Sequence, residues 1–203
     1  MAAAASDTGE LGEHYDQINL EAMHQLVDAE PHKSVIAADV VRKSVGPDLD
    51  GWKLAAHVEH DAFVAKEALQ EATTRDKQRW GKRPLPMLNV WSQTDTGLKK
   101  CRTCIAGNQQ VLDPTAQRWT AQAEPSSVFL AAKMAAMRRW KISKLDVKGA
   151  FLNAPLSDDE LILVQPPTQW VQWGIVEPGT IWKLRKAVDG LRQSPNWWGR
   201  RTG

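Results

Sequence analysis

The feature that most constrains the fold of this 203-residue chain is the turn sequence Asp95-Thr96-Gly97. It separates two runs with strand character, residues 87–92 and 98–106, and a glycine-containing turn between such runs is typical of a β-hairpin. The sequence therefore predicts two antiparallel strands near the middle of the chain.

Helical patterns flank this hairpin. Residues 51–76 carry apolar side chains at steps of three and four, which predicts one continuous helix, and a second helix is predicted to open at Pro125, a residue that suits the first turn. The first buried stripe would consist of Ala55, Val58, Ala62, Ala65 and Leu69, and the second of Phe129, Ala132, Ala136 and Trp140.

Short apolar segments later in the chain predict further strands. They span residues 141–147, 161–164 and 181–186, and a helical turn is expected within residues 190–198. This order of elements predicts an α+β fold with a small mixed or antiparallel sheet packed on helices.

The N-terminal quarter differs from the rest in charge. Residues 1–50 hold 3 Lys and Arg against 10 Asp and Glu, with helical patterns at 17–29 and 35–41. We expect residues 1–49 to form an acidic, loosely anchored extension and residues 50–203 to form the folded domain.

The C-terminal half is basic, with 16 Lys and Arg against 8 Asp and Glu in residues 97–203. Such a balance favours a polyanionic partner, nucleic acid first, although a solvated basic surface without a ligand fits it equally well. Two cysteines exclude a disulfide framework. The sequence begins without the pattern of a secretory signal and holds no membrane-length apolar run, so we expect an intracellular protein, cytoplasmic or nuclear.

Ten tryptophans accompany only 1 Tyr and 3 Phe. Trp rings stack on bases in some nucleic-acid-binding proteins. Most of these rings are nevertheless expected to pack in the core or on the surface of the protein.

Asp146 is the strongest candidate for a chemical role in this half of the chain. It closes a predicted strand with Leu145 and Val147 on the opposite face, a position from which a carboxylate can hold a hard divalent cation. From spacing alone, a strand-end Asp is more often the N-cap of the next helix.

The pair Cys101 and Cys104 does not predict a zinc site, even with His57 and His60 as further candidates. Residues three apart on a strand face opposite sides, and one CxxC without a second pair is a weak signal.

Several segments taken together carry a family resemblance. They are residues 100–110 (KCRTCIAGNQQ), 144–156 (KLDVKGAFLNAPL), 165–167 (QPP), 182–188 (WKLRKAV) and 190–195 (GLRQSP). In this order they resemble the reverse transcriptase of copia-type LTR retrotransposons, over residues 50–199. The resemblance implies the N-terminal fingers and part of the palm of an RNA-directed DNA polymerase, with an RNA or DNA template–primer and deoxynucleotides as partners and Mg²⁺ as cofactor.

The resemblance also implies roles for individual residues. Asp146 and the backbone carbonyl of Val147 would be ligands of the catalytic Mg²⁺ ions, and Phe151 would be the gate that excludes a 2′-hydroxyl. Arg102, assisted by Lys100, would clamp the incoming triphosphate with its bidentate fork. Taken without the resemblance, Phe151 fits a core aromatic, and Lys100 and Arg102 fit a solvated strand edge.

The sequence departs from the family pattern in two places. The family carries a second carboxylate pair on an aromatic-x-Asp-Asp hairpin, whereas the acidic residues after Asp146 cluster only at residues 158–160 in a predicted loop. Asp189 stands where the family has Tyr, beside the incoming nucleotide. We therefore expect a truncated reverse transcriptase domain from a retrotransposon polyprotein that is inactive alone, the alternative being a non-catalytic nucleic-acid-binding remnant or a non-functional fragment.

Overall fold

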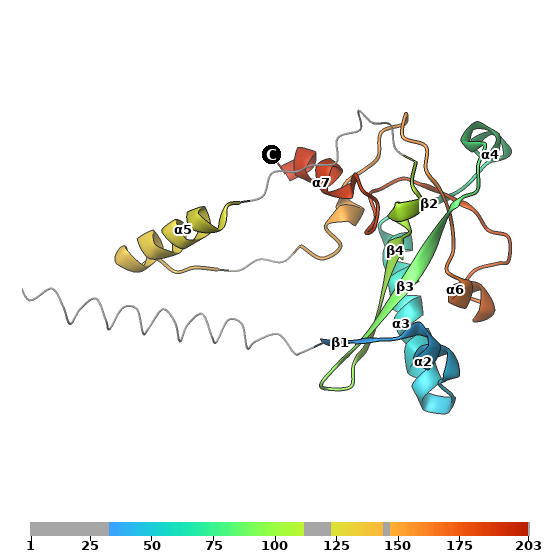
Figure 1. Ribbon diagram of the computed structural model, residues 1–203, viewed down its shortest axis with the longest axis horizontal. Helices are drawn as coiled ribbons and strands as arrows, with labels where there is room; N and C mark the ends of the chain where they lie inside the picture. Colours follow the sequence, from blue (N-terminus) through green and yellow to red (C-terminus); the bar gives the residue numbers. More distant parts are fainter. Residues whose placement is uncertain (1–32, 112–122, 144–146, 203) are drawn as a thin grey trace, which may run out of the picture. The chain divides into compact units, whose positions relative to one another are not determined.

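A computed structural model describes residues 33–111, 123–143 and 147–202. The chain divides into two compact units. The described part of the smaller unit contains helix α5 (Pro125–Met137), and the larger unit contains the other described elements (Figure 1).

The larger unit combines helices with a mixed sheet, which confirms the predicted α+β class. Its elements are β1 (Lys33–Ile36), α2 (Ala38–Lys43), α3 (Gly46–Ala65), β2 (Leu69–Glu71), α4 (Thr74–Trp80), β3 (Leu85–Thr94), β4 (Lys99–Ile105), η1 (Gly107–Gln109), η2 (Phe151–Asn153), β5 (Leu163–Gln165), α6 (Thr168–Gln172), β6 (Trp182–Leu184) and α7 (Ser194–Thr202). Within the described residues, none of these helices has the length and apolar character required to cross a membrane.

Strand β3 is the centre of the sheet. Its second half pairs antiparallel with β1, nearly its whole length pairs antiparallel with β4, and its first two residues pair parallel with β5. Strands β6 and β2 then extend the sheet beyond β5. The long β3 is plain in Figure 1, with α3 alongside the β3–β4 ribbon.

The predicted hairpin is confirmed as β3 and β4. The turn residue Gly97 has φ +82°, a conformation that glycine adopts without steric cost, and the Thr94 N–H donates to the Leu98 carbonyl across the turn at 3.0 Å. The predicted strands at 161–164 and 181–186 are confirmed as β5 and β6, with somewhat different bounds.

Helix α3 differs from its prediction in extent and in the face that it buries. It begins at Gly46, with Pro47 in its first turn, and ends at Ala65. Its buried side chains are Trp52, Ala55, Ala56 and Phe63, whereas the expected Val58, Ala62 and Ala65 are exposed. The helix turns this face toward β4, so tertiary packing rather than the strongest local stripe selects the buried side.

The predicted helix does not continue to residue 76. Glu67 has φ +51°, which breaks the helix, and β2 follows directly. The next helix, α4, starts with a capping box in which the Thr73 side chain accepts from the Asp76 N–H and the Asp76 carboxylate accepts from the Thr73 N–H. Strand β2 and helix α4 are findings that the sequence analysis did not predict.

Residues 33–49 belong to the sheet unit rather than to a separate extension. β1 pairs with β3, and Val41 of α2 is fully buried in the core. The helix expected at 35–41 is therefore divided between a strand and α2, and the helix expected at 17–29 lies outside the described residues.

The helix predicted at Pro125 is confirmed as α5, but its expected stripe is not buried in the described part of the chain. Phe129 and Trp140 are 64% and 58% exposed, while Ala135 is buried. The strand expected at 141–147 is not seen at residues 141–143 or at Val147, and residues 144–146 lie outside the described part.

Tryptophan rings form the centre of the core, as predicted for most of them. Trp52 meets Trp91 edge-on with 5.7 Å between ring centroids, and Trp91 lies 5.7 Å from Trp173. Trp170 packs edge-on against Phe63 at 6.3 Å. These rings join α3, the central strand β3 and the region around α6 into one apolar cluster.

The end of β4 meets the segment before α7 by direct backbone contact. A Cβ atom added to Gly107 would lie 1.9 Å from the Gly190 carbonyl oxygen, and one added to Gly190 would lie 2.1 Å from the Ile105 carbonyl oxygen. Only glycine permits this approach, which joins two segments more than 80 residues apart in sequence.

This contact predicts a large cost for Gly107→Ala. The added methyl group collides with backbone that cannot yield easily, so we expect the free energy of unfolding to fall by about 3 kcal/mol. Urea unfolding followed by tryptophan fluorescence measures the change. Gly179→Ala is the control, because Gly179 has φ +82° but open space around it, and the backbone strain there should cost only about 1 kcal/mol. Equal losses in the two variants would contradict the close contact.

Candidate functional site

The two faces of β4 have different characters. Cys101, Thr103 and Ile105 are buried, whereas Lys100 and Arg102 are exposed on the opposite face. Across the ribbon, Arg102 pairs in register with Val90, which is 41% exposed. The two cationic side chains that the family resemblance singles out therefore share one solvent-facing surface.

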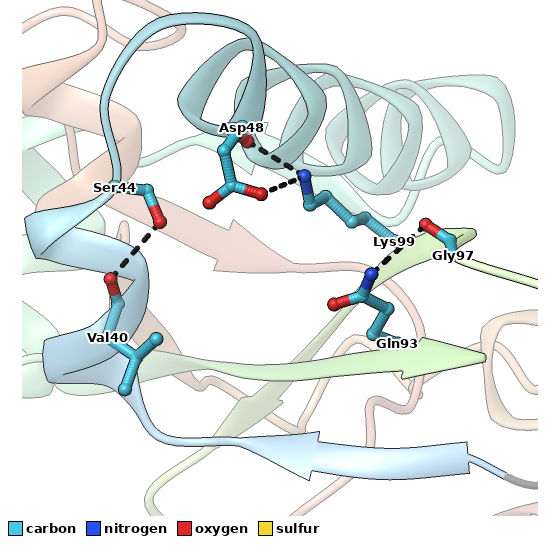
Figure 2. Close-up of polar contacts among 6 residues, drawn as sticks. All are labelled: Val40, Ser44, Asp48, Gln93, Gly97 and Lys99. Carbon is cyan, nitrogen blue, oxygen red and sulfur yellow. Dashed lines mark hydrogen bonds and ion pairs between the residues drawn. The ribbon is translucent and has the colours of Figure 1, made fainter. Parts of the chain in front are cut away.

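Helix α3 holds the start of β4 through an ion pair. The Lys99 ammonium donates to the Asp48 carboxylate and to the Asp48 carbonyl oxygen, as Figure 2 shows. The same ammonium lies 5.2 Å from the centre of the Trp52 ring. The hydrogen bond from Lys99 is the largest cause that lowers the pKa of Asp48.

Helix α3 also holds the middle of β4, through Glu59. The Glu59 carboxylate accepts a hydrogen bond from the Thr103 N–H at 2.6 Å, and the Thr103 hydroxyl donates to the Asn89 side-chain oxygen at 2.9 Å. A carboxylate on an otherwise apolar helix face thus supplies an acceptor to the edge of the strand.

The third attachment of β4 is to the segment that precedes α7. The Ile105 N–H donates to the Asp189 carbonyl at 2.8 Å. Close by, the Gln110 amide donates to the Gln193 side-chain oxygen at 3.0 Å, a buried contact, and accepts from the Arg192 N–H at 3.3 Å. The motif segments around 100–110 and 190–195 therefore form one joined structure.

The charges at this junction influence one another. Burial raises the pKa of Glu59, and nearby Asp189 acts in the same direction, while the Thr103 N–H and the Arg102 charge oppose them. Burial, assisted by Asp189, also raises the pKa of the Cys104 thiol. Glu59, Arg102, Cys104 and Asp189 thus make up one electrostatic neighbourhood, which we call the β4 edge site.

Phe151 lies in η2 rather than in the β4 edge site. It is half-buried against the main core, and the neighbouring Asn153 accepts a hydrogen bond from Lys66, just after α3, at 2.8 Å. η2 also packs beside α7. Arg102 is therefore carried by a strand that contacts the segment before α7, and Phe151 by an element that contacts α7.

Asp146, the predicted catalytic carboxylate, lies outside the described residues, as does Leu145. Val147, expected on the apolar face of the strand and therefore buried, is 50% exposed, so this expectation is wrong. Within the described ranges no group of three or more His, Cys, Asp or Glu side chains is arranged to hold a metal ion. Of the acidic cluster at 158–160, Asp158 lies 3.5 Å from Arg185 on the surface.

No role was predicted from the sequence for Glu59, Gln110 or Gln193. The signal for Glu59 was its spacing of four and three residues from Ala55 and Ala56, which places a carboxylate on the buried face of the helix. The Gln110–Gln193 contact joins residues 83 apart, and no local pattern signals such a pair.

Comparison with known proteins identifies the family. A model of the reverse transcriptase (RNA-dependent DNA polymerase) family matches residues 76–202, more than half of the chain. The chain therefore belongs to the reverse transcriptase family.

Similar proteins place this domain among those of retrotransposons, which confirms the copia-type resemblance. The chain is 38% identical over 76 residues to the retrovirus-related Pol polyproteins from transposons RE1 and RE2 of Arabidopsis thaliana. The match covers 36% of this chain and 5% of each polyprotein, so the chain spans a small part of these relatives. No solved structure matches the chain.

The two faces of β4 predict different reactivities for its cysteines. Burial raises the pKa of Cys101 to about 12, so very little thiolate exists at pH 8, whereas Cys104 is less buried. We expect iodoacetamide at pH 8 to alkylate Cys104 at least ten times faster than Cys101, as measured by mass spectrometry of the digested protein. Cys104→Ser should leave only slow labelling, and equal rates would contradict the assignment of the faces.

Proposed function

We propose that the larger unit is the nucleotide-binding part of a retrotransposon reverse transcriptase and that it binds deoxynucleoside triphosphates and a template–primer. The observation that supports this most directly is the exposure of Lys100 and Arg102 on one face of β4. α3 and Asp189 hold this strand at the edge that β3 does not pair with. A strand fixed in this way presents its cations in a constant direction.

Arg102 is proposed to bind the triphosphate. Its planar guanidinium presents paired N–H donors that match phosphate oxygens, and Lys100, two residues away on the same strand face, adds a second positive charge. The half-exposed Val90 beside Arg102 offers apolar surface against which a base or sugar can rest.

Phe151 is proposed, from the resemblance, to exclude a 2′-hydroxyl, and Asp146 with the Val147 carbonyl to hold Mg²⁺. Bound Mg²⁺ would activate a primer hydroxyl and stabilise the leaving pyrophosphate. The described residues alone do not supply the several carboxylates that two such ions need, so the role proposed for this unit is binding and orientation of the nucleotide.

Asp189 is proposed to weaken triphosphate binding. Its backbone carbonyl accepts from the Ile105 N–H at 2.8 Å, three residues after Arg102 on the same strand. A negative charge there offsets part of the attraction between Arg102 and a triphosphate.

A second candidate function is non-catalytic binding of nucleic acid. The excess of Lys and Arg in residues 97–203 favours it, because phosphate contacts alone give binding that is independent of sequence. This function would be distinguished by an affinity for RNA or DNA that decreases steeply as the salt concentration rises, without selectivity for a triphosphate.

The triphosphate role predicts opposite effects for two substitutions. Arg102→Ala should weaken binding of dATP with Mg²⁺ about tenfold, because a charge-assisted contact is lost. Asp189→Asn, which keeps the size of the side chain, should strengthen it several-fold at low salt. Isothermal titration calorimetry on the 203-residue chain measures both effects.

The control is Arg42→Ala, which removes an exposed arginine from α2. It should leave dATP affinity unchanged. Equal losses from Arg42→Ala and Arg102→Ala would indicate general attraction to positive charge and contradict a specific role for Arg102.

A polypeptide of these 203 residues is predicted not to extend a primer. It contains Asp146 but no aromatic-x-Asp-Asp sequence, and two metal ions at close spacing repel unless several carboxylates neutralise them. The measurement is primer extension with Mg²⁺ and four deoxynucleotides, with Asp146→Asn as background. Asp189→Tyr should not restore activity, and extension above background would show that other acidic residues complete the metal site.

A further inference from the structure

We infer that Glu59 is a positioning residue for Arg102, because its carboxylate fixes the peptide group from which the Arg102 side chain departs. The inference extends the proposed function, since it gives the triphosphate-binding role of Arg102 a structural cause. Its geometric part can be tested without any nucleotide.

The contact acts on the peptide between Arg102 and Thr103. The Thr103 N–H belongs to that peptide, and it donates to Glu59 at 2.6 Å. Among the described strands, β4 pairs with β3 alone, so this N–H lies on the edge of β4 that no strand covers. The carboxylate of α3 occupies the place that a neighbouring strand would otherwise take.

Fixing this peptide supports the direction of Arg102, which the pairing of β4 with β3 sets. Side chains alternate between the faces of a strand, so a shift of one residue in the register of β4 would turn Arg102 toward α3 and bring its buried neighbours to the surface. The Lys99–Asp48 side-chain ion pair holds the start of β4, and the bond from the Ile105 N–H to the Asp189 carbonyl holds the end of this edge. Glu59 holds the point between them, directly beside Arg102.

The charges around Glu59 make this contact responsive to Arg102. The Glu59 carboxylate interacts electrostatically with Arg102 and Cys101 of β4 and with Asp189 of the segment before α7. The carboxylate therefore accepts a hydrogen bond from the backbone and also attracts the Arg102 charge. A glutamine at this position would keep the hydrogen bond and lose the attraction.

The first test follows the Thr103 amide proton by NMR between pH 3.5 and 8 in the ¹⁵N-labelled chain. A proton bonded to a carboxylate shifts when that group titrates, and the midpoint should lie above 4.5 because burial raises the pKa of Glu59. The titration should vanish in Glu59→Gln and persist in Asp189→Asn. The inference is overturned if it persists in Glu59→Gln or vanishes in Asp189→Asn.

The second test distinguishes positioning from a merely structural role. In Glu59→Ala we expect the Arg102 side-chain Nε–H group to become more mobile in heteronuclear NOE measurements, while exchange of the Val164 amide in β5 stays unchanged. Glu59→Gln should restore most of the order of Arg102, because its amide oxygen still accepts from Thr103. Asp50→Asn removes an exposed carboxylate from the same helix and should have no effect. Equal changes at Arg102 and Val164 would contradict the inference.

The third test connects Glu59 to the nucleotide. Glu59→Ala should weaken dATP binding several-fold in the presence of Arg102 and should cause no further loss in Arg102→Ala. Additive losses would show that Glu59 acts independently of Arg102 and would overturn the inference. If the unaltered chain binds no dATP, the proposed function fails, while the amide titration and the order of Arg102 still decide the role of Glu59.

Discussion

The attachment of β4 to α3 is the constraint on which the candidate site depends. Among the described strands, β3 alone covers an edge of β4, and the other edge would otherwise expose backbone donors to solvent. Two carboxylates of one helix hold the strand, Asp48 through the Lys99 side chain and Glu59 through the Thr103 N–H of this edge. Lys100 and Arg102 therefore face outward from a strand that is held both by its pairing with β3 and by groups far away in sequence.

The second constraint is the close contact of Gly107 with Gly190. Because neither residue has a side chain, the end of β4 and the segment before α7 approach until their backbones touch, and the Ile105 N–H donates to the Asp189 carbonyl. The buried pair of Gln110 and Gln193 adds polar specificity to the same junction. Two of the motifs by which the chain resembles reverse transcriptases therefore have a structural task, which is to join the β4 edge site to the region of η2 and α7.

Local sequence patterns predicted the parts of the fold that local interactions determine. The hairpin was predictable because Asp95-Thr96-Gly97 supplies a turn between two apolar runs, and the start of α5 was predictable from Pro125. The end of α3 was not predictable, because no glycine or proline stands at Glu67. The φ of +51° at Glu67 arises where the chain turns into β2. The buried face of α3 was also missed, because contact with β4 selects it over a competing apolar stripe. The sequence likewise supplied Lys100 and Arg102 through a family resemblance, but Glu59 became visible only when α3 and β4 were seen together.

The central claim is that the outer face of β4 binds the triphosphate of a nucleotide. Its most direct test is a map of chemical-shift changes when the ¹⁵N-labelled 203-residue chain is titrated with dATP and Mg²⁺. The account predicts saturable changes concentrated at the amides of residues 99–105 and 189–190 and at the Arg102 side chain, with β1 and α2 unaffected. Changes confined to other elements, or no changes at millimolar dATP, would contradict it.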